Sequence, residues 1–235
     1  MSVITALTAQ NTLGVTGIHP VPVDFVEAQM DAVFSDIGAD AVKIGMLFSP
    51  ELIARVSEIL KKYNISNIVL DPVMVAQSGD RLIEDDAVEA LKTLLVPLAS
   101  LITPNLPEAS VMLDRQISSR DDLEQAAVDL AALGCENVLI KGGHLEHEDS
   151  DDLLYLGRQD RTVTFATARI KTRNNHGTGC TLSSAIASGL ARGLNMEEAV
   201  AAAKKYITRA IESGSAFRIG RGHGPVDHFF QIRSS

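Results

Sequence analysis

The 235-residue sequence predicts an α/β fold in which a mainly parallel sheet lies between two layers of helices. Two observations carry this prediction: short apolar runs alternate with longer segments of helical period, and polar residues follow almost every run. With 46% hydrophobic residues, the chain buries one large core. We therefore expect a single domain that spans residues 1–235.

The apolar runs are interpreted as buried strands because they are short and bounded by turn residues. They are Val3–Leu7, Ala41–Ile44, Ile68–Leu70, Ser100–Ile102 and Val138–Ile140. Two further runs, Leu153–Leu156 and Thr162–Thr167, are separated by the polar stretch GRQD. This spacing predicts an antiparallel hairpin added to the parallel sheet.

The segments between the strands have the periodicity of amphipathic helices. They are Asp24–Phe34, Pro50–Tyr63, Ile83–Leu95, Pro107–Leu113 and Arg120–Leu133. Near the C-terminus, one helix is expected from the GTGC motif to a stop at Gly193, and another from Glu197 to about Ser213. The glycine-rich tail RIGRGHGPVDHFF ends in aromatic residues that we expect to dock on the body.

Charge and composition exclude several classes of function. The formal net charge is -9 and no Lys/Arg-rich block occurs, so neither a nucleic acid nor an anionic membrane is expected as a partner. The sequence has no apolar stretch long enough to span a bilayer and no basic start typical of a secretory signal. Two cysteines are too few for a disulfide framework, which predicts a reducing, cytoplasmic setting. The acidic charge fits a small metabolite as the partner.

Polar residues follow the predicted strands, and the carboxyl ends of parallel strands share the edge where ligands bind. The segments expected there are 8–11, 45–46, 71–74, 103–105 and 141–144. Turn formation and helix capping would by themselves explain Asp71 and Glu108. Their coincidence with Asn105 and Lys141 at one edge favours a ligand site.

The GTGC motif predicts an anion-binding turn at the start of a helix. The first amides of a helix lack intrahelical partners, so Gly177, Thr178 and Gly179 can hold phosphate oxygens without a basic side chain. The motif is neither a P-loop nor a dinucleotide fingerprint, and close packing is the alternative role of its glycines. At the helix start Cys180 is a candidate base or nucleophile, whereas Cys135 is interpreted as a buried hydrophobic residue.

Two histidines remain ambiguous from the sequence. His144 opens the stretch HLEHEDSDD, for which a solvated acidic loop is preferred over a metal site. His176 directly precedes the GTGC motif and either contacts the ligand or holds the turn.

Seven stretches of the sequence resemble the hydroxymethylpyrimidine and phosphomethylpyrimidine kinases of thiamine biosynthesis, which have the ribokinase-like three-layer α/β/α fold. They are VITALTAQNT, KIGML, VLDPVMVAQSGD, LITPNLPEA, KGGH, HGTGCTLSSAIA and GHGPVDHF. The resemblance implies ATP-dependent phosphorylation of 4-amino-5-hydroxymethyl-2-methylpyrimidine and then of its monophosphate to the diphosphate. It also implies Mg²⁺ as a cofactor and a homodimer.

The resemblance assigns the acceptor side of the site to five residues of this chain. Gln10 would hydrogen-bond the aminopyrimidine in a pocket lined by Thr8, Met46 and Val73. Cys180 would stand where sugar kinases of the same fold carry an aspartate base.

On the nucleotide side, the resemblance implies that Asp71 and Glu108 hold Mg²⁺, directly or through water. Asn105, Lys141 and Gly142 would address the ATP phosphates, and the GTG turn would form the anion hole.

Members of the family open with a strand, a glycine-rich turn and a helix that precede the segment matched by Met1. We therefore expect a chain about thirty residues short at this end, with an unpaired strand edge, lower solubility and weaker substrate binding. Three alternatives stay open: a pyridoxal or pyridoxine kinase, an acyl transferase with Cys180 as nucleophile and His176 as base, and an inactive truncated binder. Gln10 and Met46 favour the pyrimidine.

Overall fold

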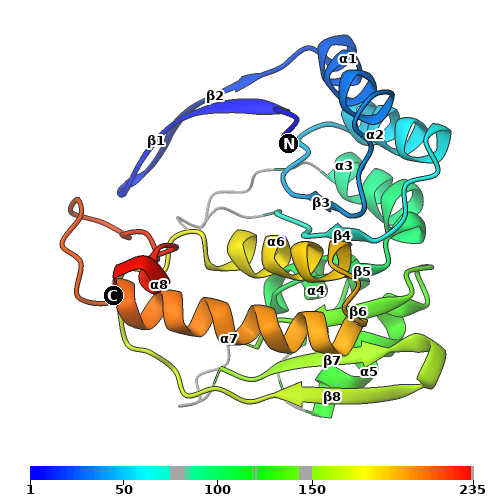
Figure 1. Cartoon of the computed structure of the whole chain (residues 1–235). Coiled ribbons are helices and arrows are strands. Elements are labelled where there is room, and N and C mark those ends of the chain that lie inside the picture. The colour runs from blue at the N-terminus through cyan, green and yellow to red at the C-terminus, as the bar shows by residue number, and fades with distance from the viewer. Residues whose placement is uncertain (75–82, 84, 118, 120, 143–149, 234–235) are drawn as a thin grey trace.

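The structure is a computed structural model. It describes residues 1–74, 83, 85–117, 119, 121–142 and 150–233 (Figure 1). The solvated acidic loop expected after His144 lies outside these residues as far as residue 149. At its end the expectation is wrong, because Asp152 begins a strand and is buried.

Six strands form the central sheet in the order β3-β4-β5-β6-β7-β8. Neighbouring strands are parallel from β3 to β6, whereas β7 and β8 are antiparallel additions. Their bounds are β3 (Val42–Ile44), β4 (Ile68–Leu70), β5 (Leu101–Ile102), β6 (Asn137–Ile140), β7 (Asp152–Leu156) and β8 (Arg161–Phe165). The mainly parallel sheet and its appended hairpin are therefore confirmed.

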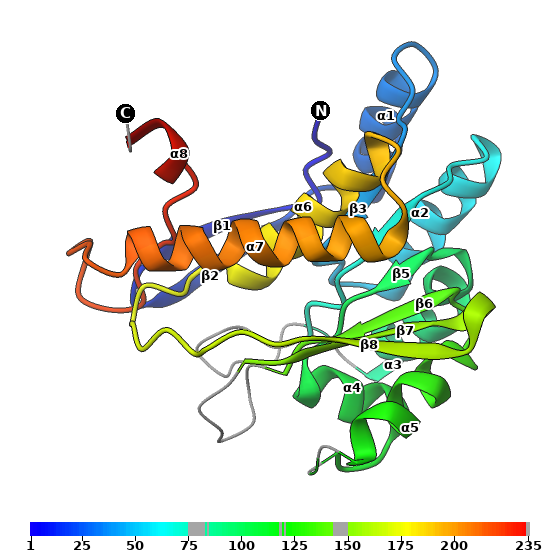
Figure 2. The same cartoon turned by 60° about the horizontal axis from the view of Figure 1, so that its bottom comes forward.

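Helices cover both faces of the sheet (Figure 2). One face carries α1 (Val23–Phe34), α2 (Pro50–Lys62), α3 (Asp85–Ala90), α4 (Leu106–Leu113) and α5 (Asp121–Ala131). The other face carries α6 (Thr178–Ala191) and α7 (Met196–Gly214), with the short α8 (Phe230–Arg233) packed on α7.

Side chains alternate across the sheet with the period of two expected of strands. In β4, Leu70 joins the core beneath α1 to α5, whereas Val69 joins the core beneath α6 and α7. In β5, Ile102 and Leu101 divide in the same way. Both faces of these strands are buried, which confirms the three-layer α/β/α fold.

The predicted helix from Ile83 to Leu95 has a different geometry at its C-terminal half. Helix α3 ends at Ala90, a π-helical turn covers Leu91–Leu95, and a 3₁₀ turn covers Val96–Leu98. Proline lacks a backbone N–H and its ring crowds the preceding turn, so Pro97 accounts for the loss of regular α-helix.

The prediction of a buried strand at Val3–Leu7 is wrong. The chain instead forms a separate two-stranded antiparallel sheet, β1 (Ala6–Asn11) with β2 (Gly14–Pro20). A tight turn joins the two strands, and within it the Leu13 amide donates to Asn11 Oδ1 at 2.8 Å. Because β2 follows at once, β1 pairs locally and leaves Leu7 56% exposed.

The tip of this hairpin contacts the C-terminal segment 219–229. The His223 amide donates to the Thr12 carbonyl at 2.8 Å, and a Cβ on Gly222 would lie 1.9 Å from that same oxygen. The segment also contacts the residues before α6, where the His176 amide donates to the Gly224 carbonyl at 3.0 Å. Of the two aromatic residues expected to dock, Phe230 is buried, whereas Phe229 is 63% exposed. None of the helices in the described residues is long and apolar enough to cross a membrane.

Candidate active site

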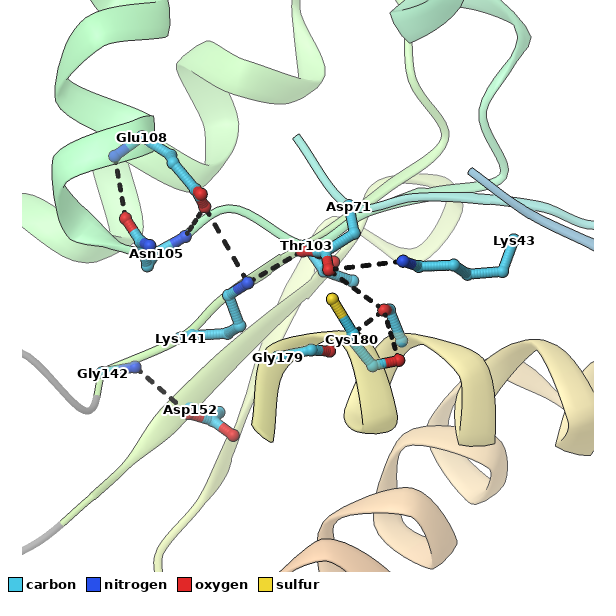
Figure 3. Close-up of polar contacts among 11 residues, drawn as sticks. Lys43, Asp71, Thr103, Asn105, Glu108, Lys141, Gly142, Asp152, Gly179 and Cys180 are labelled. Atoms are coloured by element: carbon cyan, nitrogen blue, oxygen red, sulfur yellow. Dashed lines mark hydrogen bonds and ion pairs between the residues drawn. The ribbon is translucent and has the colours of Figure 1, made fainter. Parts of the chain in front are cut away.

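Asp71 is the centre of a buried polar cluster at the end of β4 (Figure 3). Its side chain accepts hydrogen bonds from Thr103 Oγ1 at 3.1 Å, from Lys141 Nζ at 2.9 Å and from Ser183 Oγ at 3.2 Å. Pro72 follows directly and cannot continue a central strand, so the chain turns there. Thr103 and Lys141 directly follow β5 and β6, Ser183 lies on α6, and together they hold the carboxylate in one orientation.

Lys141 links this carboxylate to a second one. It follows β6 and pairs with Asn105 in an isolated parallel bridge, and its Nζ lies 3.8 Å from Glu108 Oε2. Burial lowers the pKa of Lys141, but the charges of Asp71 and Glu108 outweigh burial and raise it above the ordinary value. The ammonium therefore stays charged at neutral pH.

Asn105 and Glu108 form a capping box at the start of α4. The Glu108 amide donates to Asn105 Oδ1 at 2.9 Å, and the Asn105 amide donates to Glu108 Oε2 at 2.8 Å. Glu108 therefore has the helix-capping role that the sequence analysis gave as an alternative. The same glutamate also faces Lys141, so capping does not exclude a role in ligand binding.

The two carboxylates differ in their electrostatics. Burial raises the pKa of Asp71, but the charges of Lys141 and Lys43 more than offset it and lower the pKa below the usual value. Burial also raises the pKa of Glu108, and Lys141 opposes this only in part, so that the pKa of Glu108 stays above its usual value.

The N-terminal turn of α6 faces the Asp71 cluster. Gly177 adopts φ 85° as the N-cap, a conformation suited to glycine, and no side chain caps the helix. A Cβ on Gly179 would lie 3.3 Å from Lys141 Nζ and 4.0 Å from Asp71 Oδ2. Thr178 holds the turn, because its hydroxyl donates to the Asn175 carbonyl at 2.7 Å.

Cys180 lies on this first turn of α6 and is exposed. Figure 3 shows Cys180 at the start of α6, where the Ser183 hydroxyl lies 3.2 Å from both the Cys180 carbonyl oxygen and Asp71 Oδ2. Within the described residues no hydrogen bond joins Cys180 to His176. Cys135, in contrast, is buried as expected, and burial raises the pKa of its thiol to about 12.

The structure divides the predicted pyrimidine pocket between two places. Met46 and Val73 follow β3 and β4, close to the cluster, and both are partly buried. Thr8 and Gln10 are exposed on β1. They were expected directly after a strand of the central sheet, but this segment pairs with β2 in a separate hairpin. Across the described part of the chain, no hydrogen bond connects Thr8 or Gln10 to Met46 or Val73. The Thr5 hydroxyl, which donates to the Met46 carbonyl at 3.2 Å, ties the base of the hairpin to this edge.

Two lysines that sequence reasoning missed belong to the surroundings of the cluster. Lys43, inside β3, places its Nζ 3.8 Å from Asp71 Oδ2. A lysine within an otherwise apolar strand was the available signal, because lysine is seldom buried without a partner.

Lys204 on α7 is the second lysine that was not predicted from the sequence. Its Nζ donates to Asp152 Oδ2 at 2.7 Å and to the Ser150 carbonyl at 2.8 Å. Asp152 Oδ1 in turn accepts from the Gly142 amide at 3.1 Å, directly after Lys141. A Cβ on Gly142 would lie 1.8 Å from the Asp151 carbonyl oxygen, so only glycine fits there. The ion pair of Lys204 and Asp152 therefore fixes the backbone next to Lys141.

Lys204→Met is expected to lower the free energy of unfolding by about 3 kcal/mol, because it leaves the carboxylate of Asp152 buried without its charged partner. Urea unfolding followed by circular dichroism measures the change. Lys205→Met changes an exposed neighbour and serves as the control. The double variant Lys204→Met/Asp152→Asn should regain part of the loss, and a Lys204→Met protein as stable as the control would refute the assignment.

A cavity of about 460 Å³ opens elsewhere on the chain and shares no residue with the cluster. It is lined by Lys171, Thr172, Arg173, Asn174, Ser215, Ala216, Phe217 and Arg218. The Asp71 cluster is the stronger candidate site, because buried carboxylates, a charged lysine and a helix start without a side-chain cap converge there.

Comparison with known proteins decides the family. Residues 1–227 match the phosphomethylpyrimidine kinase family. The chain belongs to this family. It is 51% identical to a hydroxymethylpyrimidine/phosphomethylpyrimidine kinase of Rhizobium meliloti, over 97% of this chain and 85% of that protein. It is 52% identical to a thiamine biosynthesis bifunctional protein of Geobacter sulfurreducens, of which it spans 46%.

Solved structures agree with the family and the fold. The crystal structure of a phosphomethylpyrimidine kinase from Clostridium difficile has a TM-score of 0.78 at 44% identity, over 90% of this chain and 86% of that one. A pyridoxal kinase from Staphylococcus aureus in complex with AMP-PCP and pyridoxal has a TM-score of 0.88 at 33% identity, over 98% and 82%. The chain is therefore a kinase with the ribokinase-like fold.

Proposed function

We propose that this chain transfers the γ-phosphoryl group of ATP to the hydroxymethyl group of 4-amino-5-hydroxymethyl-2-methylpyrimidine, and then to the resulting monophosphate. One observation carries the proposal: the charged Lys141 and the carboxylates of Asp71 and Glu108 face the uncapped start of α6 beside Cys180. Phosphoryl transfer depends on positioning and on neutralising charge, and this arrangement supplies both.

Each group has a separate part in the proposed reaction. Lys141 and the amides of the turn Gly177–Gly179 hold the oxygens of the transferring phosphoryl group. The acceptor oxygen forms its bond to phosphorus while the bond from the γ-phosphorus to the bridging oxygen breaks, and ADP leaves. The proton of the acceptor hydroxyl passes to the Cys180 sulfur.

We propose Asp71 and Glu108 as the residues that would hold Mg²⁺. Carboxylate oxygens suit this hard cation, which takes one or two of them together with phosphate oxygens and water. Both carboxylates approach the same ammonium, Lys141 Nζ, and therefore lie on one side of the site. Among the described residues no group of three or more His, Cys, Asp or Glu could hold a metal, so nucleotide phosphates would complete the coordination. The ion would neutralise phosphate charge.

Consumption of ATP with the hydroxymethylpyrimidine tests the proposed function directly. Pyridoxal is the matched second acceptor, because a structural neighbour was solved with pyridoxal bound. We expect kcat/KM for the pyrimidine to exceed that for pyridoxal. A higher kcat/KM for pyridoxal would replace the proposed substrate, and binding without turnover of either would reduce the chain to a binder.

Cys180→Ala is expected to lower kcat by about 10²–10⁴-fold, the usual contribution of a general base, while turnover remains measurable. The residue is exposed, so its removal leaves the core intact. Single-turnover phosphorylation with saturating ATP measures the chemical step, and equal melting temperatures verify the fold. Activity equal to that of the wild type would show that the base lies elsewhere.

We also propose a homodimer and a cytoplasmic location. Exposed apolar side chains on the β1–β2 hairpin support an interface between two copies; they are Leu7, Leu13 and Ile18. Both cysteines are free, as a reducing compartment would leave them.

A further inference from the structure

A kinase that phosphorylates an alcohol and then the phosphate ester it has made must accept a neutral acceptor first and an anionic one afterwards. The curated relative from Rhizobium meliloti carries both activities in its name. If this chain does the same, as proposed above, the second acceptor needs a cation that the first does not use. Two lysines, Lys141 and Lys43, lie beside Asp71, and their contacts differ.

Lys141 already donates a hydrogen bond within the cluster. Its Nζ donates to Asp71 Oδ1 at 2.9 Å and lies 3.8 Å from Glu108 Oε2. Its backbone pairs with that of Asn105, on the side assigned to the nucleotide. We therefore expect Lys141 to contact the phosphates of ATP in both reactions, because ATP is the phosphoryl donor in both.

Lys43 stands on the other side of Asp71. Its Nζ lies 3.8 Å from Asp71 Oδ2, which is beyond hydrogen-bond distance, so Coulomb attraction holds it without using its N–H donors. In the described part of the chain, Lys43 Nζ has no hydrogen-bonding acceptor. The side chain is only 18% exposed. A largely buried ammonium group whose N–H donors make no hydrogen bond to the described residues is suited to bind an anion.

The backbone around Lys43 is shaped for this placement. Lys43 lies in β3, and the same strand leads within three residues to Met46, on the side assigned to the pyrimidine. A Cβ on Gly45 would lie 2.7 Å from Lys43 Nζ, so the absence of a side chain there lets the ammonium fold back over the end of the strand. Met46 and Lys43 Nζ therefore share one end of β3.

The two lysines flank Asp71 from opposite sides, and Figure 3 shows the carboxylate of Asp71 between the two ammonium groups. Ser183 Oγ, on the second turn of α6, donates to the same Asp71 oxygen that Lys43 approaches. Lys43 thus faces the helix that carries Cys180, from the acceptor side. We infer that Lys43 binds the phosphate of the monophosphate acceptor and is the residue that admits the second phosphorylation.

The inference predicts a selective loss. Lys43→Met keeps the length of the side chain but removes its charge and donors, which the hydroxymethyl group of the first acceptor does not require. A charge-assisted hydrogen bond to phosphate is strong and is lost only for the second acceptor. We expect kcat/KM for the monophosphate to fall on the order of 10²-fold, and kcat/KM for the alcohol to fall by less than about fivefold.

The experiment measures both acceptors on one preparation of the whole chain, with ATP saturating and each product separated by anion-exchange chromatography. Lys141→Met is the matched control, since it should lower both reactions by similar factors. Lys43→Arg retains the charge and should restore most of the monophosphate reaction even if Lys43→Met is less stable.

Equal losses for the two acceptors in Lys43→Met would overturn the inference, because they would mean that Lys43 acts only through the charge of Asp71. An unchanged monophosphate reaction would overturn it as well. A wild-type chain that phosphorylates neither acceptor is a failure of the proposed function itself, which the wild-type arm reveals before any variant is compared.

Discussion

Asp71→Asn is expected to lower kcat/KM by about 10³-fold for either acceptor, at the upper end of what the loss of one preorganised electrostatic group produces. The substitution has the same shape: with its amide oxygen in the Oδ1 position it still accepts from the Thr103 hydroxyl, and its NH2 group in the Oδ2 position donates to the Ser183 hydroxyl. What disappears is the negative charge between Lys43 and Lys141. Both ammonium groups then repel each other, and the proposed Mg²⁺ loses a ligand.

Because the substitution leaves two lysines near a neutral amide, part of the effect falls on stability. We expect the unfolding free energy to drop by about 3 kcal/mol, as for other buried ion pairs that lose one partner. Single-turnover kinetics, with ATP affinity measured by calorimetry, separate catalysis from folding. An Asp71→Asn protein that is folded and retains activity within tenfold of the wild type would remove Asp71 from the catalytic group.

The pKa values of the two carboxylates give stability opposite pH dependences. The lowered pKa of Asp71 means that its contribution is present above its unfolded pKa and is lost as the pH falls through the folded pKa. The raised pKa of Glu108 has the reverse sign, since ionising this buried group works against the fold as the pH rises through its folded pKa. Asp71→Asn should therefore flatten the acid side of the stability profile.

The sheet was predictable because its strands are short apolar runs between turn residues. The runs at Ile68–Leu70 and Val138–Ile140 lie in β4 and β6 as expected. Asp71, Asn105 and Lys141 could be grouped from the sequence for the same reason, since the ends of parallel strands meet at one edge.

Other features depend on contacts that the sequence does not reveal. The run Val3–Leu7 was as apolar as the true strands, but the competing partner β2 follows it immediately. Lys43 was not predicted as a site residue, because it lies within a strand and not after one. The contact of Asp152 with Lys204 joins β7 to α7 across 52 residues, and neither residue carries a local signal for the other.

Gly179→Val is expected to lower kcat by more than Cys180→Ala does, to about 10³-fold or more below the wild type. A Cβ at this position already lies 3.3 Å from Lys141 Nζ. The two γ-methyl groups of valine would extend from it toward the Lys141–Asp71 pair and across the amides at the start of α6. The phosphoryl oxygens would then lose both the amides and the lysine.

Two matched variants separate this steric effect from a change in the helix. Gly179→Ala adds only the Cβ and should give an intermediate loss, since Lys141 can yield by a few tenths of an ångström. Ser184→Val places the same β-branched residue on an exposed site of α6 and should leave kcat unchanged. Rapid-quench measurement of the bound product, with melting temperatures for all variants, checks the series. If Gly179→Val and Ser184→Val were equally active, the start of α6 could not be the site that holds the transferring phosphoryl group, because no anion would fit beside that valine.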